Sequence, residues 1–197
     1  MALCLAESLL HCGGFDARDQ MARYTNWWQW GYLSSTGECF DIGNTVSSAL
    51  QRFLRTGDPF AGSTDPMSAG NGSLMRLAPV VLYYHPDAEA VDRYCGESSR
   101  TTHGAAEAIE CCRLLGHRIA MALDGRSKEE VLSGAPVNLA EPRVLELAHG
   151  SFRHKRSQDI VGSGYSVASL EAALCLPSMP VWQPARITMG NSKPLDL

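Results

Sequence analysis

The segment Ser68-Ala69-Gly70-Asn71-Gly72-Ser73-Leu74-Met75-Arg76-Leu77-Ala78-Pro79 joins a glycine-rich turn to a strongly apolar run. Gly70, Asn71 and Gly72 tolerate unusual backbone angles, and Ser73 is a residue type that caps helix N-termini. The pattern therefore predicts a tight turn followed by a helix start. Such a start presents unpaired N–H groups that suit a phosphate or another anion. Arg76 would add a fixed charge there or pair with an acid that holds the loop. By itself, the motif is more often structural than functional.

Length and composition favour one compact domain. A chain of 197 residues with a net charge of −4 is not expected to bind nucleic acid or an anionic membrane. No apolar run is long enough to cross a bilayer, and the amino terminus does not resemble a signal peptide. The seven cysteines show neither a C-x-x-C pair nor zinc-site spacing, which predicts reduced thiols in the core. We therefore expect a monomeric protein in the cytoplasm.

Helical periodicity runs through most of the chain, and no period of two extends over five residues. The fold class is therefore predicted to be all-α. Between the helices, residues 31–43 and 57–72 are predicted to be loops, and loops this long in a compact domain are often functional. The expected helices cover residues 2–12, 17–30, 44–56, 74–84, 86–94, 103–123, 128–132, 142–148 and 167–175.

Two further motifs accompany the first. Gly37-Glu38-Cys39-Phe40-Asp41-Ile42-Gly43-Asn44-Thr45 lies about thirty residues upstream, and Ser98-Ser99-Arg100-Thr101-Thr102-His103 lies about thirty residues downstream. Together with the opening Met1-Ala2-Leu3-Cys4-Leu5-Ala6-Glu7-Ser8-Leu9, they resemble the ADP-ribosylglycohydrolase family, most closely its bacterial branch that removes ADP-ribose from dinitrogenase reductase. The resemblance covers residues 1–175 and implies a single, compact, multi-helix domain, incomplete at both ends.

The resemblance implies a hydrolase that cuts ADP-ribose from a protein side chain at the anomeric carbon of the ribose. Asp41 is its expected catalytic residue. Tyr165 would stack on the adenine base, although it could equally pack over its own helix start. His103 should be neutral and bind a sugar or phosphate oxygen, with a helix cap or a core residue as the alternative. The implied substrate-binding residues are Asn44, Gly70, Asn71, Gly72, Ser73, Arg76, His103, Gly164 and Tyr165.

Members of the family place two Mg²⁺ or Mn²⁺ ions beside the sugar. The acidic motifs that hold them have no match here, so no metal-ligating residue is predicted and this chain is expected to be inactive. The expected partner is an ADP-ribosylated protein or a small molecule that contains ADP-ribose. The alternatives are a catalytically dead ADP-ribose-binding or scaffold protein of the same fold, and a helical interaction domain with structural glycine motifs.

Two expectations concern the ends of the chain. Residues 176–197 contain four prolines and one acid, and we expect them to be unrelated to the family and disordered. Loss of the family's first and last helices should leave apolar side chains partly uncovered, and the affected side chains would be Leu3, Leu9, Leu74, Val80 and Leu170.

Overall fold

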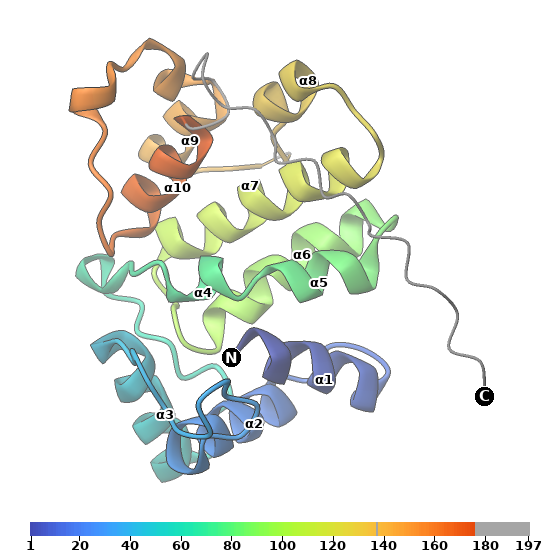
Figure 1. The fold of residues 1–197 in the computed structure, drawn as a ribbon, viewed down its shortest axis with the longest axis vertical. Coiled ribbons are helices and arrows are strands. Elements are labelled where there is room, and N and C mark those ends of the chain that lie inside the picture. Colours follow the sequence, from blue (N-terminus) through green and yellow to red (C-terminus); the bar gives the residue numbers. More distant parts are fainter. Residues whose placement is uncertain (137, 176–197) are drawn as a thin grey trace, which may run out of the picture.

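A computed structural model describes residues 1–136 and 138–175, and in that part of the chain it contains α-helices and no β-strand (Figure 1). The predicted all-α fold is confirmed. The expected tail, residues 176–197, lies outside the described residues. The helices are α1 (Ala2–Cys12), α2 (Ala17–Trp30), α3 (Asn44–Thr56), α4 (Gly72–Met75), α5 (Ala78–Tyr84), α6 (Ala88–Arg100), α7 (Ala106–Leu123), α8 (Lys128–Ser133), α9 (Pro142–Ala148) and α10 (Ser166–Cys175).

The helices form three tiers in the view of Figure 1. Helices α1 to α3 make the lowest tier, α4 to α7 the middle one, and α8 to α10 the upper one. Helix α7 has 18 residues and contacts α4, α5, α6, α8, α9 and α10. It is therefore the central element against which the middle and upper tiers pack.

Local sequence signals set the ends of the first helices. Helices α1, α2 and α3 end at Gly13, Gly31 and Gly57, and each of these glycines has the left-handed conformation. At the other end, the side chain of Asp16 accepts a hydrogen bond of 2.8 Å from the N–H of Asp19 and so caps α2. The predicted bounds of these three helices are confirmed.

The apolar run of the middle tier is split into α4 and α5, and Pro79 lies in the first turn of α5, where a missing N–H costs nothing. This agrees with the expectation that Pro79 either bends the run or starts its second part. The tier differs from the prediction at two other places. Helix α6 continues to Arg100, six residues beyond the expected end at Tyr94. His103 does not begin a helix, because α7 starts at Ala106.

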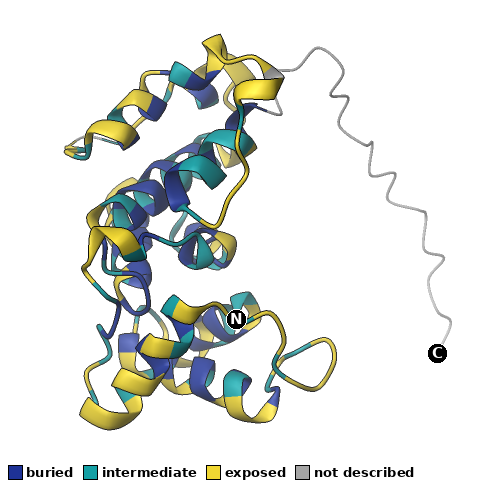
Figure 2. Ribbon diagram, turned by 90° about the vertical axis from the view of Figure 1, so that its left-hand side faces the viewer, coloured by how far each residue is buried: buried dark blue, intermediate teal, exposed yellow. Residues whose placement is uncertain are grey.

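The buried residues form a core that runs through the tiers, with exposed residues on the outer surfaces (Figure 2). Leu9 and Val80 are fully buried, and Leu74 and Leu170 are 9% and 2% exposed. The expectation that these four are uncovered is wrong, because α1 packs on α2 and α5, and α10 packs on α7 and α9. Only Leu3 of the five is open to solvent, at 63%.

Two buried charged side chains of α7 attach the upper tier. Glu110 accepts hydrogen bonds of 2.8 Å from the N–H groups of both Ala140 and Glu141, just before α9. Arg118 donates to Gly134 O at 3.1 Å and, at 3.4 Å, to the last carbonyls of α9. Burial lowers the pKa of Arg118 to about 10, so it stays charged at neutral pH. Within the described residues, no helix combines the length and the apolar character needed to cross a membrane.

Candidate active site

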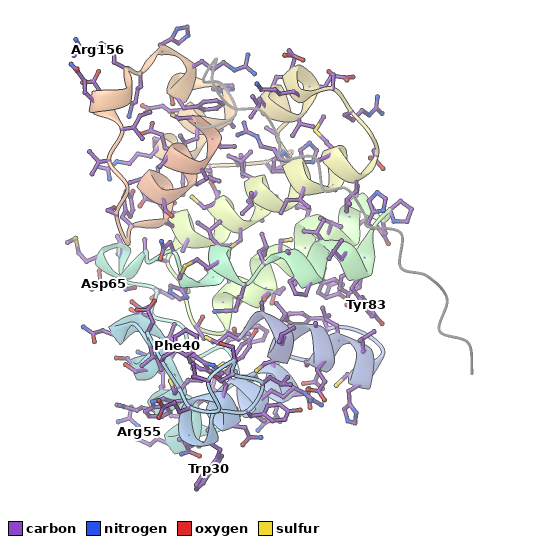
Figure 3. The ribbon with its side chains drawn as sticks, in the orientation of Figure 1. Trp30, Phe40, Arg55, Asp65, Tyr83 and Arg156 are labelled. Atoms are coloured by element: carbon purple, nitrogen blue, oxygen red, sulfur yellow. The ribbon has the colours of Figure 1, made fainter. Side chains whose placement is uncertain are left out.

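A cleft of about 740 Å³ lies between the lowest and middle tiers. Its walls are the start of α1, the 31–43 loop, the first turn of α3 and the segment around α4. The loop that carries Phe40 passes in front of α2 and α3 in Figure 3. Seven of the ten predicted site residues line this cleft, namely Asp41, Gly70, Asn71, Gly72, Arg76, His103 and Gly164. Segments that lie as far apart in the sequence as Met1 and Gly164 therefore meet at one place.

The two glycines of the Gly-Asn-Gly turn are explained by the ring of His103. A Cβ atom on Gly72 would lie 2.9 Å from His103 Cε1, and one on Gly70 would lie 3.3 Å from His103 Nε2. Neither glycine has a positive φ, so the turn does not use the unusual backbone angles that glycine tolerates. Glycine is suited to these two positions because a side chain there would crowd the imidazole ring.

His103 is held from several sides. Its Nδ1 is 2.8 Å from the hydroxyl of Thr102, and its carbonyl oxygen is 3.0 Å from the hydroxyl of Ser99. The backbone of residues 62 and 63 runs alongside, where Gly104 N donates to Ser63 O at 3.0 Å. The side chain is 1% exposed, and burial, followed by the charge of Arg76, lowers its pKa to about 3. The predicted neutral form is confirmed, but its cause is burial and not a helix N-terminus.

Asp41 is an exposed residue in the loop before α3, and its φ of 53° lies in the left-handed region. Leu33, in the same loop, has a φ of 55°. Such angles are uncommon outside glycine, and they gather at functional sites where the surrounding structure imposes them. Both residues line the cleft.

Asp41 is also the only carboxylate among the described residues that line the cleft. In the part of the chain that the structure describes, no three His, Cys, Asp or Glu side chains come together in a way that could hold a metal ion. A pair of Mg²⁺ or Mn²⁺ ions needs several converging carboxylates. The residues present here therefore do not fit a dinuclear metal centre.

Arg76 lies beneath the cleft and is 2% exposed. Its guanidinium carbon is 4.9 Å from the centroid of the Tyr24 ring, and its Nη2 donates to Ser98 O at 2.9 Å and to Thr101 Oγ1 at 3.2 Å. No carboxylate pairs with it within 4.0 Å among the described residues, so of the two alternatives for Arg76 the pairing with an acid is wrong. Arg76 thus ties α4 to the end of α6, immediately before His103.

Three predicted residues lie outside the cleft. Ser73 is buried inside α4, with its hydroxyl 3.0 Å from that of Ser99, so it does not cap the helix. Asn44 opens α3 but lines a second, smaller hollow. The hydroxyl of Tyr165 donates a hydrogen bond to Glu107 of α7 and accepts one from Arg143 of α9 at 3.0 Å, and the residue does not line the cleft.

The N-termini of both α3 and α4 line the cleft, but that of α3 is the stronger one. Helix α3 has 13 residues and Gly43 as its N-cap, whereas α4 has only four residues and therefore a weak dipole. In the expected anion-binding turn, the N–H groups of Gly70 and Asn71 are already bonded to Ser68 O and Gly164 O. The N–H of Gly72 has no acceptor among the described residues and remains available for a ligand.

Apolar side chains at the rim of the cleft were missed by the sequence reasoning. Leu33, Phe40 and Met75 line it and are 38%, 52% and 73% exposed, and Trp27 forms part of the wall. In sequence, Met75 belongs to an apolar run that reads as core, and Phe40 is an isolated aromatic in a loop. Only their shared exposure at one cleft marks them as a surface for an apolar part of a ligand.

The sequence profile of the ADP-ribosylglycohydrolase family matches residues 1–179, which includes every described part of the cleft. This chain belongs to the ADP-ribosylglycohydrolase family. The resemblance inferred from the three motifs is thus confirmed. The cleft that gathers the motifs is the candidate active site of a family member.

Two curated relatives support this assignment. The ADP-ribosylarginine hydrolase Tri1 of Pseudomonas putida (strain GB-1) is 40% identical over 174 residues, which are 88% of this chain and 47% of that protein. The ADP-ribosylarginine hydrolase Tri1 of Serratia proteamaculans (strain 568) is 35% identical over 174 residues, with the same coverage. The chain therefore spans about half the length of the curated relatives it matches.

Proposed function

We propose that this chain binds ADP-ribose in the cleft and acts as the recognition part of a hydrolase for arginine-linked ADP-ribose. The observation that supports the proposal most is the meeting of Asp41, the Gly70–Gly72 turn and His103 in one cleft. The names of the two curated relatives support arginine as the modified residue. The ligand would come from an ADP-ribosylated protein or from a small molecule that contains ADP-ribose.

Each part of the ligand has a chemical counterpart in the cleft. The carboxylate of Asp41 would accept hydrogen bonds from ribose hydroxyls. The free N–H of Gly72 and the N-terminus of α3 would donate to pyrophosphate oxygens, and the apolar rim around Phe40 and Trp27 would cover the adenine base. His103 would act from beneath, by fixing the turn that presents Gly72.

Hydrolysis would replace the bond between the anomeric carbon and the arginine nitrogen with a bond to a water oxygen, and a proton would pass to the leaving guanidine. A single carboxylate does not supply the ligands for two metal ions, so we propose that this step needs acidic residues beyond those described here. The same observation favours a second candidate function, namely ADP-ribose binding without turnover.

Titration calorimetry of the 197-residue chain with ADP-ribose tests the binding proposal. We expect binding, and we expect the Asp41→Ala variant to weaken it by about tenfold or more, because a charge-assisted hydrogen bond contributes about 1.5–3 kcal/mol. Arg153→Ala is the matched control, since Arg153 is exposed and lies outside the cleft. Absence of binding, or equal affinities of the two variants, would refute the proposal.

A second assay separates turnover from binding. The same chain is incubated with ADP-ribosylarginine and Mg²⁺ or Mn²⁺, and the release of ADP-ribose is measured. We expect no release above the uncatalysed rate. Release that depends on Asp41 would show that the described residues are sufficient for hydrolysis and would contradict the binding-only candidate.

A further inference from the structure

A second hollow, of about 410 Å³, opens beside the cleft between α3 and residues 61–68. Thr45 lines both spaces, and its hydroxyl lies 3.7 Å from where a Cβ on Gly70 would stand. The hollow and the cleft are therefore neighbours that share one wall. Asp65, on the far side of the hollow, lies near the upper end of α3 in Figure 3.

The α3 side of this hollow carries polar side chains that the fold does not use. The side chains of Asn44, Ser48 and Arg52 have no hydrogen bond or ion pair with any described residue. Opposite them are Ser63 and Asp65, whose carboxylate accepts from one backbone N–H at 2.9 Å. The hollow thus offers an amide, hydroxyls, one cation and one anion.

This chemistry excludes several ligands. No aromatic ring is among the residues that line the hollow, so a nucleobase would have no stacking partner. The charges of Arg52 and Asp65 cancel, which does not suit a diphosphate. The polar groups do not suit a hydrocarbon chain. An extended polypeptide, with an N–H and a C=O in every residue, matches a mixed set of donors and acceptors.

We propose that the hollow binds the polypeptide that flanks the modified arginine while ADP-ribose occupies the cleft. This inference rests on the proposed function. In this arrangement Asn44 would bind the target polypeptide and would not bind the ribose. Arg52 would favour an acidic residue beside the modified arginine, and Asp65 a basic one, so the pair would set which target sequences bind.

The first test compares three probes by their affinity for the 197-residue chain: ADP-ribose, ADP-ribosylarginine, and a short peptide with one ADP-ribosylated arginine. The peptide should bind about tenfold more tightly than ADP-ribosylarginine. Ser48→Trp fills the hollow and should abolish this gain without changing the affinity for ADP-ribose. Gln51→Trp, on an exposed position of α3 outside the hollow, is the matched control and should retain the gain.

Equal affinities of the peptide and ADP-ribosylarginine would overturn the inference, as would an equal loss in the Gln51→Trp variant. Failure of the unaltered chain to bind ADP-ribose at all would instead overturn the proposed function on which the inference rests. The two failures are thus distinguishable in one set of titrations. Circular dichroism melts of both tryptophan variants confirm that each is folded.

The second test exchanges charges. Peptides with Asp or Lys next to the modified arginine are compared for the unaltered chain and for Arg52→Glu. We expect Arg52→Glu to shift the ratio of the two affinities by about fivefold towards the Lys peptide, with the affinity for ADP-ribose unchanged. An unchanged ratio would place the flanking residues outside the hollow and refute the inference.

Discussion

Replacement of Gly72 by alanine tests the packing that builds the site. The new Cβ would lie 2.9 Å from His103 Cε1 and 3.2 Å from Nε2, so the ring must move. His103 is 1% exposed and bonded to Thr102, which leaves it little freedom to do so. Overpacking of this kind costs about 1–3 kcal/mol, whereas alanine gains up to about 1 kcal/mol over glycine in a helix. We therefore expect a net loss of about 1–2 kcal/mol in the free energy of unfolding.

Urea unfolding measures this loss, and it should appear as a lower midpoint with an unchanged slope. Gly43→Ala is the matched control, because Gly43 has an ordinary φ of −78° and a Cβ there meets no atom within 4 Å. Gly70→Ala, at 3.3 Å from the same ring, should fall between the two. The expected order of stability is therefore Gly43→Ala, then Gly70→Ala, then Gly72→Ala.

The decisive comparison uses the His103→Ala background, in which the ring is absent. There the Gly72→Ala change should cost nothing or stabilise by up to about 1 kcal/mol, because only the helix preference remains. An equal loss in both backgrounds would show that His103 is not what requires glycine at position 72. A Gly43→Ala variant as unstable as Gly72→Ala would refute the reasoning as well.

Three further predictions follow from buried groups. Glu110→Ala should lower the free energy of unfolding by about 2–3 kcal/mol, because two N–H groups before α9 lose their acceptor. The control Glu129→Ala, at an exposed position, should change the free energy of unfolding by less than about 0.5 kcal/mol in the same urea titration. The free energy of unfolding should fall by about 1.6 kcal/mol between pH 6.5 and pH 5, because His103 takes up a proton in the unfolded chain but not in the fold, where its pKa is about 3; the His103→Asn variant should lack this part of the pH dependence. Of the seven cysteines, Cys12 is the exposed one and should react first with a thiol reagent, while the five buried thiols should react only in denaturant; fast labelling of a Cys12→Ser variant would contradict this.

Much of the helical framework can be read from short stretches of sequence. Gly13, Gly31 and Gly57 end their helices in the left-handed conformation, and Asp16 caps the next one, because these preferences depend on the residue and its nearest neighbours. The motifs around Asp41, Gly70 and His103 could likewise be recognised in order, and the fold brings residues of all three together in one cleft.

The role of each motif residue depends on contacts between residues that are far apart in the sequence. Gly72 is glycine because the ring of His103, 31 positions later, lies against it, and Ser73 faces Ser99 instead of the solvent. Asn44 turns away from the cleft that Thr45 borders, since adjacent residues of a helix project in directions about 100° apart. Dihedral preferences and helix caps depend on a few neighbouring residues. Whether a side chain points into the core, the cleft or the solvent depends on which tier packs against its helix. The residue types of the site could therefore be read locally, and their roles depended on the packing of the whole fold.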